Sequence, residues 1–163
     1  MYKNYEIRRK DKEVTDRQWM EDILKRGLVM YLGLAGADGW PYVIPIGYGY
    51  LDNSLYFHGA AEGLKNDILA VNPRVCFQVT LDAEVKTADA GAKFSMKYRS
   101  VTGFGFIRAL SDTTERNAAL KIIMDHYGGP HTDFPEDNDI HKRLWVARLD
   151  IERMTGKNSI YPL

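Results

Sequence analysis

The spacing of apolar residues is helical up to Gly27 and strand-like after it. Apolar side chains three and four positions apart share one face of a helix, and this spacing predicts a helix over Thr15–Arg26. Thr15 with Gln18 is typical of a capping box, which marks the start of the helix, and Gly27 marks its end. The apolar face of this helix consists of Trp19, Ile23 and Leu24.

Strand signals and turn signals alternate along the rest of the chain. Asp38-Gly39 and Asp52-Asn53 are typical turn pairs, and the apolar runs around them predict three consecutive antiparallel strands. Further helices are expected over 62–71 and from Asp112 to about Tyr127, with a loop over 83–93. The six predicted strands cover 28–34, 42–51, 54–58, 74–81, 98–110 and 145–151.

Proline and glycine residues within two of these strands predict an edge and a bend. Pro41 and Pro45 cannot donate backbone hydrogen bonds, so the second strand is expected at a sheet edge or a bulge. Gly103 and Gly105 in the fifth strand favour the kind of bend that closes a barrel. We therefore expect one domain over residues 1–163, with a polar arm over residues 1–14. Its fold class is mainly β (α+β), a six-stranded antiparallel barrel with flanking helices.

Composition narrows the range of functions. The chain has 163 residues, of which 45% are apolar, and this is enough for one domain with its own core. Its 22 basic and 22 acidic residues cancel, which argues against a nucleic-acid or anionic-membrane partner. No apolar run approaches the ~18 residues that a membrane span requires. A single cysteine, Cys76, and a charged N-terminus indicate a reducing, cytoplasmic compartment.

The strongest chemical signal is the turn between the third strand and the following helix. It runs from His58 through small residues to Lys65, which lies in the first turn of the predicted helix. Backbone amides at a helix N-terminus and a nearby ammonium group form a site for a phosphate monoester. The segment lacks the nucleotide-binding pattern G-x-x-x-x-G-K-[ST], so an ordinary turn with an exposed lysine explains it equally well. The order of the other motifs decides between these interpretations.

Five motifs follow one another along the chain: Asp38 to Pro45, Leu55 to Ala60, Gly63-Leu64-Lys65, Asn72 to Phe77, and Tyr98 to Gly105. In this order they resemble the pyridoxamine-phosphate-oxidase-like, FMN-binding split barrels, and the resemblance is greatest to the nitroimidazole-resistance (Nim-type) branch. The basic arm, Arg8-Arg9-Lys10-Asp11, is similar to the start of that branch. The resemblance covers the chain from about Ile7 to about Gly156 and implies a split β-barrel fold.

The resemblance also implies a homodimer that holds two FMN molecules at the subunit interface. In such a dimer Lys65 binds the phosphate, the isoalloxazine ring lies against the strand from Pro41 to Gly47, and His58 lies beside the flavin. Ser100 and Val101 match positions that reach the cofactor from the partner subunit, with Arg99 as a second positive charge. The cofactor-binding candidates are therefore Val43, Ile44, Pro45, Ile46, Gly47, His58, Gly59, Ala60, Lys65, Arg99, Ser100 and Val101.

The chain departs from the oxidase itself at three places. Leu64 stands where the oxidase has an arginine before the phosphate lysine, and Met154 stands where it has a late tryptophan. The chain ends at Leu163, without the arginine-bearing tail that holds the vitamin phosphate substrate. These differences argue against oxidation of pyridoxamine phosphate.

The function expected from the resemblance is reduction of a small aromatic acceptor, of nitroaromatic (nitroimidazole-type) or quinone-like chemistry, by reduced FMN. Because the cofactor supplies the redox chemistry, few side chains need to be catalytic. His58 is the one catalytic candidate, as a proton donor or substrate contact, and a structural hydrogen bond to the turn is its alternative role. Two other functions stay open: a non-catalytic flavin-, deazaflavin- or haem-binding protein, and a structural dimer with a vestigial pocket.

Two other groups of reactive side chains are assigned structural roles. His126, His131 and His141 lie near acidic residues, but their spacing matches no zinc motif, so we expect no metal site. Cys76 lies in an alternating strand and is expected in the core as a small apolar residue.

Overall fold

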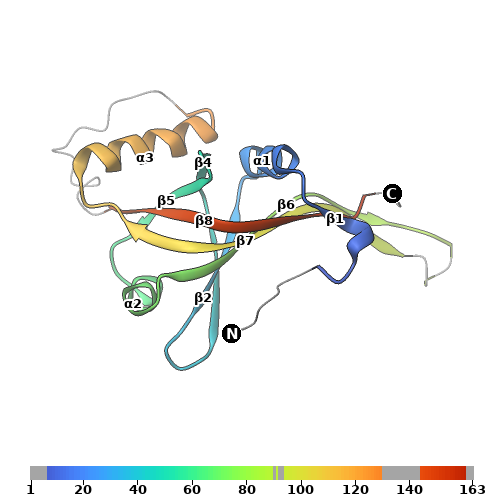
Figure 1. Cartoon of the computed structure of the whole chain (residues 1–163), viewed down its shortest axis with the longest axis horizontal. Coiled ribbons are helices and arrows are strands. Elements are labelled where there is room, and N and C mark those ends of the chain that lie inside the picture. Colours follow the sequence, from blue (N-terminus) through green and yellow to red (C-terminus); the bar gives the residue numbers. More distant parts are fainter. Residues whose placement is uncertain (1–6, 90, 92–93, 130–143, 161–163) are drawn as a thin grey trace.

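The computed structural model describes residues 7–89, 91, 94–129 and 144–160. Figure 1 shows them as a twisted antiparallel sheet with helices around it. The helices are α1 (Arg17–Arg26), α2 (Leu64–Val71) and α3 (Thr113–His126), preceded by the short 3-10 helix η1 (Lys10–Lys12). The strands are β1 (Glu13–Val14), β2 (Met30–Ala35), β3 (Pro41–Ile46), β4 (Gly49–Leu51), β5 (Ser54–Ala60), β6 (Arg74–Lys86), β7 (Ser95–Ala109) and β8 (Leu144–Asn158).

The sheet is an open barrel. Its strands follow the order β3-β2-β6-β7-β8-β5-β4, and β1 pairs with β8 outside this path. β3 and β4 lie at the two ends of the path, and within the described residues they do not pair with each other. The prediction of a mainly β, antiparallel split barrel with flanking helices is confirmed, with eight strands among the described residues instead of the six expected.

The two additional strands have identifiable causes. The expected strand over 42–51 bends at Gly47, and its two parts, β3 and β4, pair at opposite edges of the sheet. Glu13 and Val14 of the polar arm pair with β8 and form β1. The expected loop over 83–93 is also wrong in part, because β6 continues to Lys86 and forms a long hairpin with β7.

Side-chain caps fix the starts of two helices. Asp16 caps α1, because its carboxylate accepts a hydrogen bond from the Trp19 N–H at 3.1 Å. The expected cap at Thr15 is therefore wrong by one residue. Asp112 caps α3 and accepts from the Glu115 N–H at 2.9 Å, as the sequence predicts.

The bend between β3 and β4 is held by residues at the ends of α1 and α3. Tyr48 is fully buried, and its hydroxyl donates to the Leu24 carbonyl oxygen at 2.7 Å. The Tyr127 hydroxyl accepts from the Tyr48 N–H at 2.8 Å and donates to the Leu28 carbonyl oxygen at 2.7 Å. Two tyrosines thus connect the bend to the end of each long helix.

Close packing of α3 on this bend requires glycine. A Cβ atom on Gly49 would lie 2.6 Å from the carbonyl oxygen of Ile122 in α3, and backbone atoms cannot move aside cheaply. His126, at the end of α3, packs its ring 4.8 Å from the Tyr48 ring. Its Nε2 atom lies 2.6 Å from the Gly27 carbonyl oxygen, just after α1. The end of α3 is therefore fixed against both the bend and α1.

The core has two parts, on opposite faces of β8. α1 and α2 pack with the inner face of the sheet in the larger cluster, to which Ala147 of β8 belongs. The neighbouring Val146 belongs to a smaller cluster with α3. Because successive side chains of a strand point to opposite faces, α3 covers the face away from the main core. Figure 1 shows α2 and α3 on opposite sides of β5 and β8.

We predict that Tyr48→Phe lowers the free energy of unfolding by about 1–3 kcal/mol, because it leaves the buried Leu24 carbonyl without its donor. Urea denaturation measures this change. Tyr31→Phe is the matched control, since Tyr31 is 49% exposed, and it should stay within about 0.5 kcal/mol of the unsubstituted protein. Equal effects of the two substitutions would contradict a stabilising role for the bend.

Candidate cofactor site

The turn between β5 and α2 holds the Lys65 ammonium group at the end of the barrel. Gly63 caps α2 with a φ of 109°, a conformation that glycine adopts without strain. Lys65 Nζ donates to the side-chain oxygen of Asn66 and lies 3.4 Å from the Ala60 carbonyl oxygen. Asn66 Nδ2 donates to the same carbonyl at 3.1 Å. The lysine is therefore positioned, and it does not extend freely into solvent.

An indole ring packs against this ammonium group. Nζ of Lys65 lies 3.8 Å from the centroid of the Trp145 ring, within the range of a cation–π contact. Trp145 lies beside Lys65 because the register of β8 pairs Trp145 with Gly59 of β5, which is next to the lysine. A Cβ atom on Gly59 would lie 3.6 Å from Lys65 Cε, so the glycine leaves space beside the lysine.

Lys65 carries a charge that no acidic side chain of the described residues neutralises. Burial lowers the pKa of Lys65 below its ordinary value, because the ammonium group loses hydration. Among the described residues it pairs with no carboxylate; its polar partners are an amide oxygen and a carbonyl oxygen. A partly desolvated cation of this kind gains from an anionic ligand.

His58 and Lys65 lie on opposite faces of β5. His58 pairs with Val146, which is buried in the cluster with α3, whereas the adjacent Gly59 faces Lys65. The structure therefore does not bring the two predicted site residues side by side. Loss of hydration lowers the pKa of His58 below its ordinary value, so its imidazole is neutral at cellular pH.

β3 presents an apolar outer face and an open edge. Ile44 and Ile46 turn inward against the core, whereas Val43 and Pro45 point outward and Val43 is 60% exposed. One edge of β3 pairs with β2, and the other pairs with no strand of the described chain. The prediction that prolines place this strand at a sheet edge is confirmed.

The three candidates on β7 are less accessible than expected. Val101 is fully buried in the core, and Ser100 is 2% exposed. Arg99 forms an ion pair with Asp82, which neutralises the second positive charge expected at this position. Within one chain these three side chains offer a ligand no free charge.

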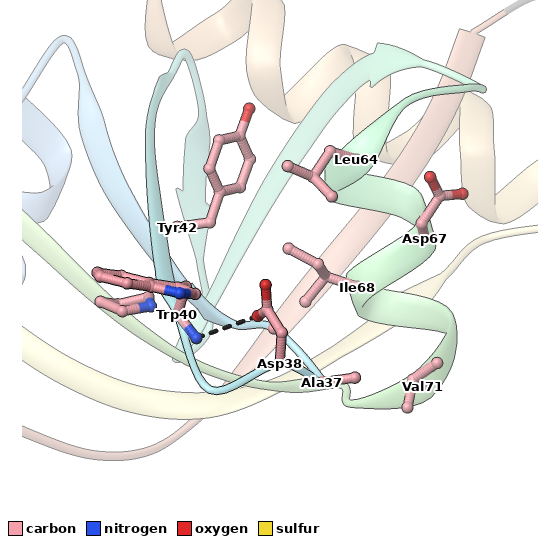
Figure 2. A pocket seen from close by; sticks show the side chains of 10 residues that line it. Ala37, Asp38, Trp40, Tyr42, Leu64, Asp67, Ile68 and Val71 are labelled. Carbon is pink, nitrogen blue, oxygen red and sulfur yellow. Dashed lines mark hydrogen bonds between the residues drawn. The ribbon is translucent and has the colours of Figure 1, made fainter.

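A cavity of about 380 Å³ lies between the β2–β3 turn and one face of α2. In Figure 2, Leu64 and Ile68 point from α2 toward Tyr42, with Asp38 below them near Trp40. None of the twelve cofactor-binding candidates lines this cavity, but Pro41 and Tyr42 of the strand expected to lie against the isoalloxazine ring do, so the cavity adjoins the predicted site. The lining residues are Gly36, Ala37, Asp38, Trp40, Pro41, Tyr42, Leu64, Asp67, Ile68 and Val71.

Two contributors to the site were not predicted from sequence: Trp145 and Asn66, both of which contact Lys65. Trp145 was placed correctly at the start of the last strand, but its partner depends on the register of β8 with β5. Asn66 follows Lys65 directly, and the only available signal was an amide side chain in the first turn of a helix.

The remaining reactive residues that the structure describes form no second site. Cys76 is half-buried on the outer face of β6, which corrects the expectation that it belongs to the core, and burial raises the pKa of its thiol. His131 and His141 lie outside the described residues. In the part of the chain that the structure describes, no His, Cys, Asp and Glu residues group to hold a metal ion. No helix there is long and apolar enough to cross a membrane.

Solved structures with the same fold include several flavin proteins. A protein of Bacteroides thetaiotaomicron proposed to act in 5-nitroimidazole antibiotic resistance is 29% identical, with 89% of this chain and 85% of that chain covered and a TM-score of 0.77. An FAD-binding protein of Mesorhizobium loti is 26% identical, with 86% and 93% covered and a TM-score of 0.63. An FAD- and haem-binding protein of Mycobacterium smegmatis is 24% identical, with 91% and 73% covered and a TM-score of 0.80, which shows the fold alone.

Sequence comparison assigns the family. No curated protein sequence matches the chain. The family model described as pyridoxamine 5'-phosphate oxidase matches residues 16–158, which is most of the chain and includes all the main-sheet strands and the three α-helices. Together with the split-barrel fold, this match shows that the chain belongs to the pyridoxamine 5'-phosphate oxidase family.

Proposed function

We propose that this chain is an FMN-binding oxidoreductase that reduces small aromatic molecules of nitroaromatic or quinone-like chemistry. The observation that carries the proposal is the Lys65 ammonium group, which lies at the start of α2 and pairs with no carboxylate among the described residues. A helix N-terminus with a nearby cation binds a phosphate monoester well. The related protein of Mesorhizobium loti binds a flavin nucleotide, which supports the same ligand class here.

The residues around the turn fit a flavin nucleotide. Lys65 and the first backbone amides of α2 would hold the phosphate, with Gly59 and Ala60 leaving space for it. The outer face of β3, from Val43 to Gly47, offers apolar surface and an open strand edge to a flat ring. A bound flavin supplies the electron transfer, so the chain has to bind, orient and shield it.

The acceptor class is proposed from the family relationship. The Bacteroides thetaiotaomicron protein, proposed to act in 5-nitroimidazole resistance, is 29% identical and covers most of this chain. A small aromatic acceptor can stack on a flat ring that lies on an open surface.

His58 has a separate proposed role as a contact to the acceptor. Because its pKa is lowered, the neutral imidazole is the form present at cellular pH, and it donates a hydrogen bond from a ring N–H. It lies on the face of β5 opposite Lys65, so its role does not depend on phosphate binding.

We also propose a homodimer with the cofactor sites at its interface. Tyr31, Gln78 and Thr102 form a cross-strand row on the outer face of β2, β6 and β7. Tyr31 and Gln78 are exposed there, and Val43 extends the apolar part of this face to β3. A second copy that covered this face would bring its β7 segment, with Arg99 to Val101, near the flavin of the first.

The lysine prediction tests the proposed function directly. Lys65→Met should weaken FMN binding roughly ten- to a hundred-fold, because it removes a charge-assisted contact, and should weaken riboflavin binding much less. Quenching of flavin fluorescence measures both affinities. Lys25→Met, on the exposed side of α1, is the matched control and should change neither.

Trp145→Leu extends this test to the residue that positions the lysine. The substitution should weaken FMN binding, as Lys65→Met does, but by a smaller factor, because Nζ of Lys65 loses its cation–π contact and keeps its charge.

Equal losses of FMN and riboflavin affinity in the Lys65→Met variant would show that the phosphate binds elsewhere. If the unsubstituted protein binds neither flavin, the proposed function is wrong.

We predict that His58→Ala keeps the fold and most of the bound FMN but loses most reductase activity toward nitroaromatic or quinone acceptors. In the unsubstituted protein, activity should rise as pH decreases through the lowered pKa of His58, below pH ~6.5, because the imidazolium form is the stronger hydrogen-bond and proton donor. The variant should lack this rise. Flavin content, melting temperature and pH–rate profiles are measured on the same samples, and a fully active variant removes His58 from the mechanism.

The dimer is tested by sedimentation at several protein concentrations. The unsubstituted protein should sediment as a dimer, and Tyr31→Glu should dissociate it, because a charge would be buried in the interface. FMN binding should be lost with the dimer. A monomer that holds a full complement of FMN would exclude an interface site.

A further inference from the structure

The cavity beside α2 has apolar walls on both sides. Leu64, Ile68 and Val71 line it from one face of α2. Trp40 and Tyr42 line it from the opposite side. Its volume of about 380 Å³ lies at the lower end of the ~300–1,000 Å³ range of small-molecule pockets. The size and lining suit one small, mostly apolar group.

An exposed indole ring borders this cavity. Trp40 is 77% exposed, although tryptophan side chains in folded domains are highly buried on average. Figure 2 shows Trp40 and α2 on opposite sides of the opening. Among aromatic side chains, the indole ring attracts a cation most strongly, through the negative potential of its face. Trp40 therefore favours a ligand that carries positive charge.

The charged groups of the cavity are two carboxylates. Asp38 and Asp67 both line it, and none of its ten lining residues is basic. One oxygen of Asp38 accepts from the Trp40 N–H at 3.1 Å, which orients the carboxylate. The ion pairs formed among the described residues include neither Asp38 nor Asp67. A cationic ligand would supply the counter-charge that these side chains lack.

The lysine nearest to this cavity in the sequence is held away from it. Lys65 follows Leu64 directly, but its ammonium group lies against the Trp145 ring and the Ala60 carbonyl oxygen. The cavity thus keeps its negative charge beside aromatic side chains, a combination that suits an organic ammonium group. The same carboxylates repel a phosphate, so the ligand of the cavity differs in charge from the one proposed at the start of α2.

We propose that this cavity binds small organic cations in which a protonated amine is joined to a flat apolar group. The ammonium group lies between the Asp38 carboxylate and the Trp40 ring, and the apolar group packs against Ile68 of α2. This site goes beyond the proposed function and does not rest on it, because none of the cofactor-binding candidates lines the cavity.

The test is isothermal titration of the full chain with three probes that share a phenyl ring. At neutral pH phenethylamine is a cation, 2-phenylethanol is uncharged and 3-phenylpropionate is an anion. The unsubstituted protein should bind phenethylamine roughly 2- to 30-fold more tightly than 2-phenylethanol, the range that a cation–π contact supplies. It should bind 3-phenylpropionate most weakly. Saturation with FMN should leave this order unchanged.

Two variants separate the roles of ring and charge. Trp40→Leu should remove most of the preference for phenethylamine over 2-phenylethanol, because leucine is apolar but has no aromatic face. Asp38→Asn combined with Asp67→Asn should weaken phenethylamine by up to about 5-fold per carboxylate and leave 2-phenylethanol unchanged. Asparagine can still accept the hydrogen bond from the Trp40 N–H, so the turn is kept. Asp22→Asn, on α1 and outside the cavity lining, is the matched control.

The outcomes distinguish this site from the flavin site. The proposal is overturned if phenethylamine does not bind, if 2-phenylethanol binds equally well, or if the double carboxylate variant keeps full phenethylamine affinity. Displacement of phenethylamine by FMN would also overturn it, because the cavity would then belong to the flavin site. Binding of phenethylamine, with the expected preference, by a protein that binds no flavin would support this site and contradict the proposed function alone.

Discussion

The bend at Gly47 and Tyr48 determines how this sheet can curve. The chain leaves β3 at one edge of the sheet and enters β4 at the other edge within two residues. A strand that continued straight would have extended a flat meander. The bend is stable because Tyr48 is buried with both its hydroxyl and its N–H bonded, to Leu24 and Tyr127. A buried donor or acceptor left without a hydrogen bond here would lower the stability of the fold by about as much as several favourable contacts raise it.

The split that results from this bend is where the candidate site lies. With β3 and β4 at opposite ends of the strand order, β3 keeps an open edge that no described strand pairs. Pro41 and Pro45 suit that edge because they have no N–H to lose. α2 packs against the core through Ile68 and Leu69 and presents its first turn at the same end of the barrel. A ligand can thus contact a strand edge and a helix N-terminus together.

The cation at the start of α2 is held differently from two arginines of the described chain. Arg99 pairs with Asp82, and Arg108 pairs with Glu115, so these guanidinium groups are neutralised by neighbours. Lys65 instead lies against an indole ring and a carbonyl oxygen, which orient its ammonium group without neutralising it. On the other side of α2 the sign is reversed, with Asp38 and Asp67 around an apolar cavity. One short helix thus separates a surface that favours anions from one that excludes them.

The sequence alone determined the order of strands and helices, the turn positions, the edge character of β3 and the lysine at the start of α2. These features depend on neighbours within a few residues: apolar spacing, Gly and Pro signals, and a cation after a small-residue turn. The order of the motifs also indicated the family. Local signals were less accurate at the ends of elements. They placed the cap of α1 at Thr15, whereas Asp16 caps this helix.

Only the tertiary structure decided which side chains meet. Alternation along β5 shows that His58 and Gly59 point to opposite faces, but the sequence did not show that Lys65 of α2 would lie on the Gly59 side. Trp145 reaches Lys65 only through the register of β8 with β5, a pairing between residues far apart in sequence. The burial of Ser100 and the ion pair of Arg99 likewise depend on the strands beside β7. Strand register and helix packing are set by the whole core, and no local pattern carries that information.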